Sequence, residues 1–346
     1  MHIAIVSMQT DLHGPTAGRR RTRRFAEQFS TGGHTVQVLC AKWWRGEIPG
    51  FRFNEVRYEA VTEHLAPVRF ALLLPVALLR LRPDVIHVTN DPPIAVAAAR
   101  VAATVLRVPL IVDWWSPGLD RTRWSHRAAR AGDVTLVASD LLRTDLQRHG
   151  GQTESTLELP ESVDVATADA ADPIGSYDFI TAGRLDAASN IDRFLTALGQ
   201  LRQDEWEAAV IGDGPARAHA EKIAADLRIS DRVTFLGDLD PATHLGVCKG
   251  AHVFVHTREE APFATELLRA LICGCVGVVE YQEHSSAHEL VELYDRGFTV
   301  TDAADLPATI EEARDLPQQV FDDGFSRYGH GAVLQRLESI YTSPTP

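Results

Sequence analysis

Five arginines within six positions form the densest cluster of charge in the sequence. They are Arg19, Arg20, Arg21, Arg23 and Arg24. They follow a loop containing Gly14 and Gly18, at the start of a predicted helix whose apolar side carries Phe25 and Phe29. Positive charge at a helix start opposes the helix dipole, and an anion bound there by arginines and backbone N–H groups offsets that cost. The cluster therefore predicts an anion site; a solvated basic face is the alternative.

A second candidate for anion chemistry lies in the C-terminal half. Arg184 follows Gly183, directly after the apolar segment YDFITA (177–182) and before a predicted helix. A guanidinium can donate two parallel hydrogen bonds to a phosphate, and the N–H groups of a helix start add to them. We therefore expect Arg184 to bind a phosphate, with a surface arginine in a turn as the alternative. Gly212 and Gly214 could admit the backbone close to a ligand or serve only the turn itself.

Aromatic and acidic residues meet at the end of another apolar segment, PLIVDW (109–114). Asp113, near the end of this segment, is a candidate functional carboxylate. Trp114 and Trp115 could stack on a sugar ring, because aromatic faces suit the C–H face of carbohydrates. Burial in a core or interface is the equal alternative for both tryptophans.

The composition restricts the class of protein. The 346 residues carry a formal charge of −13, which argues against general nucleic-acid binding. Four cysteines are too few for a disulfide scaffold and lack the second pair that a zinc site needs. The sequence opens on an apolar strand without a signal-peptide pattern. We therefore expect a cytoplasmic protein with reduced thiols and no metal.

The elements that position these residues alternate between strand and helix patterns in both halves. Such alternation predicts parallel sheets covered by helices on both faces, and thus an α/β protein with two Rossmann-like domains facing a cleft. Neither half contains the GxGxxG pattern of dinucleotide binding or the GxxxxGK[ST] pattern of a P-loop. The polar, proline-containing segment 160–176 is predicted to be a linker.

Sequence motifs in a characteristic order indicate which family of Rossmann-like proteins this chain is similar to. They are GGHTVQVL (32–39), RPDVIHVTNDPP (82–93), LPESVD (159–164), AGRLDAASNIDRFLTAL (182–198), VIGDGP (210–215), DRVTFLGDL (231–239), AHVFVHT (251–257) and ELLRALICGCVGVVEY (266–281). Their order and spacing resemble the retaining glycosyltransferases of family 4, over nearly the whole chain. The resemblance implies the two-domain B fold of glycosyltransferases. It predicts an acceptor domain over 1–165, a linker over 166–176, a nucleotide-sugar domain over 173–316, and a segment over 317–346 whose helix returns to the first domain.

The resemblance also implies roles for particular residues. The nucleotide sugar would be bound by Gly183, Arg184, Gly212, Gly214, Phe235, Glu260 and Glu266. Of these, Arg184 and Glu266 are expected to be catalytic residues, together with Asp113 as a carboxylate on the acceptor side. The loop with Gly14 and Gly18, the arginine cluster, Trp114 and Trp115 would serve the acceptor or another anion. Neither metal nor cofactor is implied beyond the nucleotide-sugar co-substrate.

Four positions depart from the family pattern. Trp115 stands where members often have histidine, Ser189 where they have a phosphate-binding lysine, and Ala261 and Arg269 where they have two glutamates. Glu260 and Glu266 are near enough to take over the acidic positions, because residues three apart on a helix share a face. A plain ion pair between Glu266 and Arg269 is the alternative.

We therefore expect a hexosyltransferase that moves a hexose from a nucleotide sugar to a lipid-linked or glycan acceptor, with retention. A non-catalytic binding or scaffold subunit is the alternative, and a sugar-nucleotide epimerase is a third interpretation. An anionic lipid or polyprenyl phosphate as acceptor would place the protein at the inner face of the cell membrane. The arginine cluster would lead that contact, supported by segments 42–51 and 67–82, although a buried core helix is the safer interpretation of 67–82.

Overall fold

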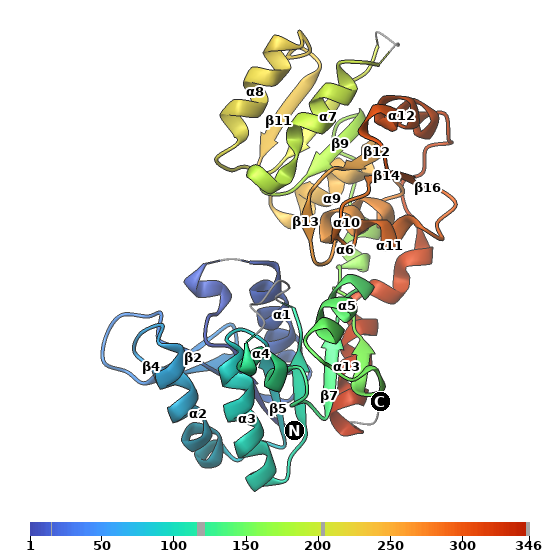
Figure 1. Cartoon of the computed structure of the whole chain (residues 1–346). Helices are drawn as coiled ribbons and strands as arrows, with labels where there is room; N and C mark the ends of the chain where they lie inside the picture. The colour runs from blue at the N-terminus through green and yellow to red at the C-terminus, as the bar shows by residue number, and fades with distance from the viewer. Residues whose placement is uncertain (15, 116–121, 202–204, 344–346) are drawn as a thin grey trace. The chain divides into compact units, whose positions relative to one another are not determined.

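A computed structural model describes residues 1–14, 16–115, 122–201 and 205–343. The chain forms two compact units (Figure 1). One contains Met1–Pro160 together with Val333–Pro346, and the other contains Glu161–Ala332. We refer to them as the N-terminal and the C-terminal unit.

The N-terminal unit is built on an eight-stranded sheet of order β3-β4-β2-β1-β5-β6-β7-β8, in which β3 alone runs antiparallel to its neighbour. The strands are β1 His2–Val6, β2 Thr35–Ala41, β3 Gly50–Phe53, β4 Val56–Thr62, β5 Val85–Thr89, β6 Leu110–Asp113, β7 Val134–Val137 and β8 Thr156–Glu158. The helices are α1 Ala17–Thr31, α2 Pro67–Leu81, α3 Pro93–Leu106, α4 Arg123–Ala128, α5 Asp140–Arg148 and α13 His330–Thr342. The central strands are buried almost throughout, as expected for a parallel sheet covered on both faces.

The last helix of the described chain completes the N-terminal core. Val333, Leu337, Ile340 and Tyr341 of α13 are buried in one cluster with strand residues such as Ile3 and Val38. Phe29 of α1 stacks on Tyr341, with ring centroids 4.9 Å apart.

The C-terminal unit has a parallel six-stranded sheet of order β11-β10-β9-β12-β14-β16. The strands are β9 Tyr177–Ala182, β10 Ala208–Ile211, β11 Val233–Gly237, β12 Ala251–His256, β14 Val276–Glu280 and β16 Gly297–Val300, and β13 Glu260–Ala261 pairs separately with β15 His284–Ser285. The helices are α6 Val165–Ala170, α7 Ile191–Leu198, α8 Arg217–Asp226, α9 Pro241–Lys249, α10 Thr265–Ile272, α11 Ala287–Val291 and α12 Leu306–Arg314. The order places β9, from the middle of the chain, at the centre of this sheet.

Two segments differ from the sequence-based expectation. The expected linker contains helix α6, which begins after Asp164, whose carboxylate accepts a hydrogen bond from the backbone N–H of Thr167. The segment after β2 forms the β3–β4 hairpin, against which Trp43 and Trp44 pack with Phe51. Within the described residues, no helix is both long and apolar enough to cross a bilayer.

Candidate functional site

The C-terminal unit has a pocket at the carboxyl ends of β9 and β12. It is lined by Thr181, Ala182, Gly183, Arg184, Leu185, Ser189, Ile191, Ile211, His256, Thr257 and Arg258. The carboxyl ends of parallel strands are where open α/β sheets bind ligands. Of the residues expected to bind the nucleotide sugar, the pocket brings Gly183 and Arg184 together.

The loop that follows β9 carries the main cation of the pocket. Arg184 is 70% exposed, and its Nε lies 3.7 Å from a carboxylate oxygen of Asp186. At that distance the pair is loose, so the guanidinium is free to turn toward an anion. Helix α7 begins directly after Asn190, which adopts a left-handed conformation, and its first N–H groups add to the positive field at this end of the sheet.

A second arginine organises the same loop. Arg258 follows β12, and its guanidinium donates hydrogen bonds to the carbonyl oxygens of Arg184 (2.9 Å) and Glu260 (3.1 Å). Its Nη2 also donates to both carboxylate oxygens of Asp186, at 3.0 and 3.1 Å. Because Arg258 takes up the charge of Asp186, Arg184 is not held by that carboxylate. Sequence reasoning missed Arg258, since 74 residues separate it from Arg184 and only the pairing of β9 with β12 brings them together.

The three glycines expected at the nucleotide have different roles. A Cβ added to Gly212 would lie 2.1 Å from the carbonyl oxygen of Gly183, and one on Gly214 would lie 2.2 Å from that of Leu185. Both are therefore required for the close packing of two loops, which supports the steric interpretation. Gly183 has a φ of +137° and open space where a Cβ would be, so its backbone is accessible to a ligand.

The acidic candidates and Phe235 do not line this pocket among its described residues. Arg269 Nη1 donates to both carboxylate oxygens of Glu266, at 2.9 and 2.7 Å, and His244 Nε2 lies 3.4 Å from one of them. The ion-pair alternative for Glu266 therefore describes this structure. Glu260 is exposed on β13, and half-buried Phe235 packs against the core of the unit.

His256, at the end of β12, is a buried polar residue of the pocket wall, as is Thr257. Burial lowers the pKa of its imidazole to about 4, and the charge of Arg258 acts in the same direction. The ring is thus neutral at physiological pH, and its Nε2 lies 3.3 Å from the hydroxyl oxygen of Ser285. Among the described residues of the pocket wall, the positive charge therefore comes from Arg184 and Arg258.

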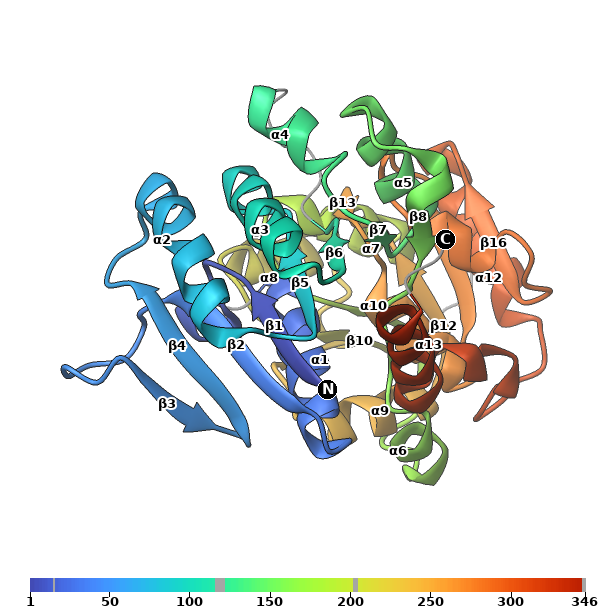
Figure 2. The same ribbon diagram turned by 90° about the horizontal axis from the view of Figure 1, so that it is seen from below.

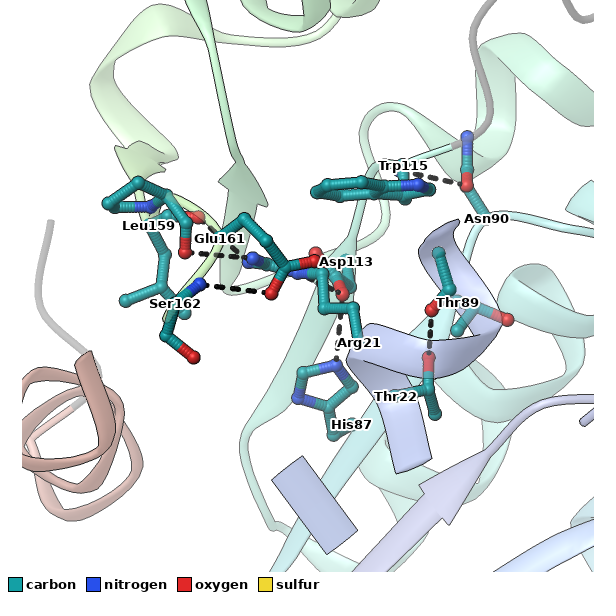
Figure 3. Close-up of polar contacts among 12 residues, drawn as sticks. Arg21, Thr22, His87, Thr89, Asn90, Asp113, Trp115, Leu159, Glu161 and Ser162 are labelled. Carbon is teal, nitrogen blue, oxygen red and sulfur yellow. Dashed lines mark hydrogen bonds and ion pairs between the residues drawn. The ribbon is translucent and has the colours of Figure 1, made fainter. Parts of the chain in front are cut away.

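In the N-terminal unit, Arg21 forms a buried ion pair with Asp113 (Figure 3). The two side chains are 0% and 1% exposed, and Nε of Arg21 lies 3.1 Å from the carboxylate. The other guanidinium nitrogens donate to the carbonyl oxygens of Leu159 and Pro160, at 2.8 and 2.9 Å. His87 Nε2 lies 3.8 Å from the same oxygen of Asp113. Burial alone would raise the pKa of the Asp113 carboxyl, but the charge of Arg21 and the contact with His87 outweigh it and hold that pKa low.

This burial corrects the expected role of Asp113 as an acceptor-side carboxylate. Its charge is neutralised by Arg21 and its side chain does not reach the surface. Trp114 is also a core residue: it is 0% exposed and its indole N–H donates to Asp145 at 2.8 Å. Trp115 is 6% exposed. The Cζ atom of Arg21 lies over the Trp115 ring, 4.9 Å from the ring centroid. Gly18 makes room for it, because a Cβ there would lie 2.1 Å from the indole.

The arginine cluster does not form one basic face. Successive residues of a helix are rotated by about 100°, so neighbouring arginines point in different directions. Arg21 points into the core; Arg23 pairs with Asp11 and Glu27, at 3.2 and 2.8 Å. Arg19 donates to the carbonyl oxygen of Gly14 at 2.9 Å, Arg20 is exposed and Arg24 is half-buried. The structure therefore assigns much of this charge to the fold rather than to an anion.

Comparison with known proteins gives matches in both units. A family model described as "Glycosyl transferase 4-like domain" matches residues 16–160, and one described as "Glycosyl transferases group 1" matches residues 168–319. A curated relative, N-acetyl-alpha-D-glucosaminyl L-malate synthase of Bacillus anthracis, is 25% identical over 139 residues. That match covers 38% of this chain, and the chain spans only 36% of the relative's length.

Solved structures match almost the whole chain, among them the following two. Sucrose-phosphate synthase from Thermosynechococcus elongatus has a TM-score of 0.77 at 16% identity, covering 99% of this chain and 98% of that one. Anabaena Alr3699/HepE, in complex with UDP and glucose, has a TM-score of 0.74 at 16% identity, covering 99% of each chain. At this level of identity the likeness shows a common fold.

Proposed function

Because the chain belongs to the group 1 glycosyltransferases, whose two models match its two units, we propose that it transfers a hexose from a nucleoside diphosphate sugar to an acceptor hydroxyl, with retention. The predicted family and the predicted two-domain B fold with Rossmann-like units are confirmed. The acceptor we propose is lipid-linked or a glycan.

One observation carries the proposal: the pocket of the C-terminal unit has an exposed arginine beside accessible backbone. In a retaining transfer, positive charge develops on the sugar ring and negative charge on the departing diphosphate. Arg184, with the first N–H groups of α7, can donate hydrogen bonds to that diphosphate. Donors fixed where charge develops lower the barrier more than they strengthen ground-state binding. That Alr3699/HepE was solved with UDP and glucose supports a nucleotide sugar as the donor.

The test is calorimetric titration of the protein with UDP, GDP, ADP and their sugars. We expect one nucleotide to bind, and Arg184→Ala to weaken that binding between about tenfold and a hundredfold, the effect of losing a charge-assisted hydrogen bond. Lys222→Ala is the matched control, because Lys222 is an exposed cation of the same unit outside the pocket lining. Binding that is unaffected by Arg184→Ala would contradict the proposed donor site.

A non-catalytic binding subunit is the second candidate, favoured by the state of Glu266. Its carboxylate is held by Arg269 and contacted by His244, and Ala261 stands at the other acidic position of the family. The two candidates differ in turnover. An enzyme releases free nucleoside diphosphate from its bound sugar nucleotide when acceptor lipids or glycans are added, whereas a binding subunit retains the donor intact.

A further inference from the structure

Large apolar side chains are exposed on two neighbouring helices of the N-terminal unit. On α2 they include Val68, Leu72, Val76 and Leu79, which are 63%, 72%, 46% and 36% exposed. On α3, Val101 and Val105 are 58% and 63% exposed. Figures 1 and 2 show α2 and α3 side by side, α2 next to β2 and β4 and α3 next to β5 and β6. We call this surface the α2–α3 face.

The spacing shows that the exposure is a property of one side of each helix. Positions 68, 72, 76 and 79 follow one another at intervals of four, four and three, which align along a helix. The opposite side of α2 buries Phe70, Leu74 and Leu78 against the unit. Helix α2 is thus apolar on both sides, which is unusual for a helix at the surface of a water-soluble domain.

The charges on this face all have one sign. Neither α2 nor α3 contains an aspartate or a glutamate, although the chain as a whole has a formal charge of −13. Arg69 and Arg80 of α2 are exposed, as are Arg82 and Arg107, the left-handed residues that end the two helices. Long basic side chains at the margin of an apolar surface can bury their stems and keep their charge at the level of lipid phosphates.

We propose that the α2–α3 face docks the protein on an anionic membrane surface. Helices of 15 and 14 residues are too short to span a bilayer but can lie in the plane of the interface. A second copy fits less well, because a two-fold interface would bring the same arginines against one another without an acid to pair them. The proposal stands on this surface alone and does not depend on the donor pocket, although a membrane-bound acceptor would be consistent with both.

Vesicle flotation tests the proposal. The full chain is mixed with vesicles of phosphatidylcholine alone, or of phosphatidylcholine with phosphatidylglycerol. Wild type should float with the anionic vesicles only. We expect Leu72→Glu/Val76→Glu, and separately Arg69→Glu/Arg80→Glu, to reduce the bound fraction about tenfold or more. All four side chains are exposed, so the variants should retain the fold; circular dichroism and the nucleotide titration above verify this independently.

Two control variants separate the proposed face from general stickiness. Leu293→Glu removes an apolar side chain that is 97% exposed in the C-terminal unit, and Arg20→Glu reverses an exposed charge of the arginine cluster. Neither should change flotation. Equal binding to both vesicle types, no effect of the α2–α3 variants, or equal loss in the controls would overturn the proposal. So would a dimer in light scattering that Leu72→Glu/Val76→Glu converts to a monomer. Nucleotide binding without flotation would reject the membrane surface and leave the proposed function intact.

Discussion

The two units each place an arginine beside an aspartate near the carboxyl ends of parallel strands. The pair of the N-terminal unit is buried, and we call it the closed pair; that of the C-terminal unit is exposed at its arginine, and we call it the open pair. Arg21 and Asp113 are 0% and 1% exposed, and two backbone carbonyls accept one hydrogen bond each from Nη1 and Nη2 of Arg21. Arg184 is 70% exposed and only 3.7 Å from Asp186 at its closest. The buried pair is held within the fold, although Oδ1 of Asp113 has no hydrogen-bond partner among the described residues, whereas the exposed cation keeps donors for a ligand. Burial, rather than residue type, therefore separates structural from functional charge here.

The largest effect should come from breaking the closed pair. Arg21→Ala leaves Asp113 buried without its cation, and we expect the free energy of unfolding to fall by about 3–5 kcal/mol. Urea unfolding followed by tryptophan fluorescence measures this. Arg20→Ala, one position away and exposed, should change stability by less than about 0.5 kcal/mol. Similar stability losses in the two variants would mean that the closed pair is not structural.

Burial also differs between two close residues of the C-terminal unit: His256 is buried, whereas Arg258, two positions further on, is half-buried. Because the folded pKa of His256 is about 4 and an unfolded histidine titrates near 6.5, only the unfolded state binds this proton between those values. Stability from this residue is therefore full above about pH 6.5 and decreases by about 3 kcal/mol as the pH falls to about 4. His256→Gln should flatten that part of the stability–pH curve. A curve of unchanged slope would show that the ring is protonated in the folded protein.

At the open site, Arg258 is predicted to act through Asp186. Arg258→Ala frees a carboxylate that would then compete with the ligand for Arg184, so nucleotide affinity should fall about tenfold, or about 1.4 kcal/mol. Adding Asp186→Asn to that variant should restore most of the affinity in a calorimetric titration. If the double variant binds as weakly as Arg258→Ala, then Arg258 contacts the ligand itself.

The smallest effect should come from adding the cation that family members have. Ser189 lines the pocket, and its hydroxyl donates only to the carbonyl of Asp186, at 2.6 Å. Ser189→Lys should strengthen nucleoside diphosphate binding by roughly two- to fivefold, the range of an exposed ion pair, without affecting the nucleoside. Ser189→Gln is the uncharged control of similar length. Equal affinity for lysine and glutamine variants would indicate that the diphosphate lies elsewhere.

Much of the fold could be predicted because apolar segments specify it. The runs 2–7, 84–89 and 251–257 are apolar on successive residues and form central strands. Helix α6 could not be predicted from the sequence, because its small residues have no apolar period and its start depends on the Asp164 cap.

The site was harder to predict, because the positions of charged residues in a sequence do not show which of their side chains are buried. The arginines of α1 are neighbours in sequence, yet only the fold places Arg21 in the core, beside Asp113 at the end of β6. Conversely, the exposed side of α2 could not be distinguished from a core face, since both sides are apolar. Arg258 acts on residues more than seventy positions away, through contacts made by strand order alone.

Helix α13 has a consequence for how the protein is made. The hydroxyl of Tyr341 lies 2.6 Å from Nδ1 of His87, and Val333 and Leu337 fill the same core as the first strands. During synthesis, the core around β1 and β5 is complete only when residues 333–341 have emerged from the ribosome, after the whole of Glu161–Ala332. The C-terminal unit is a continuous segment and can form first. The order of maturation is therefore expected to be the reverse of the order of translation.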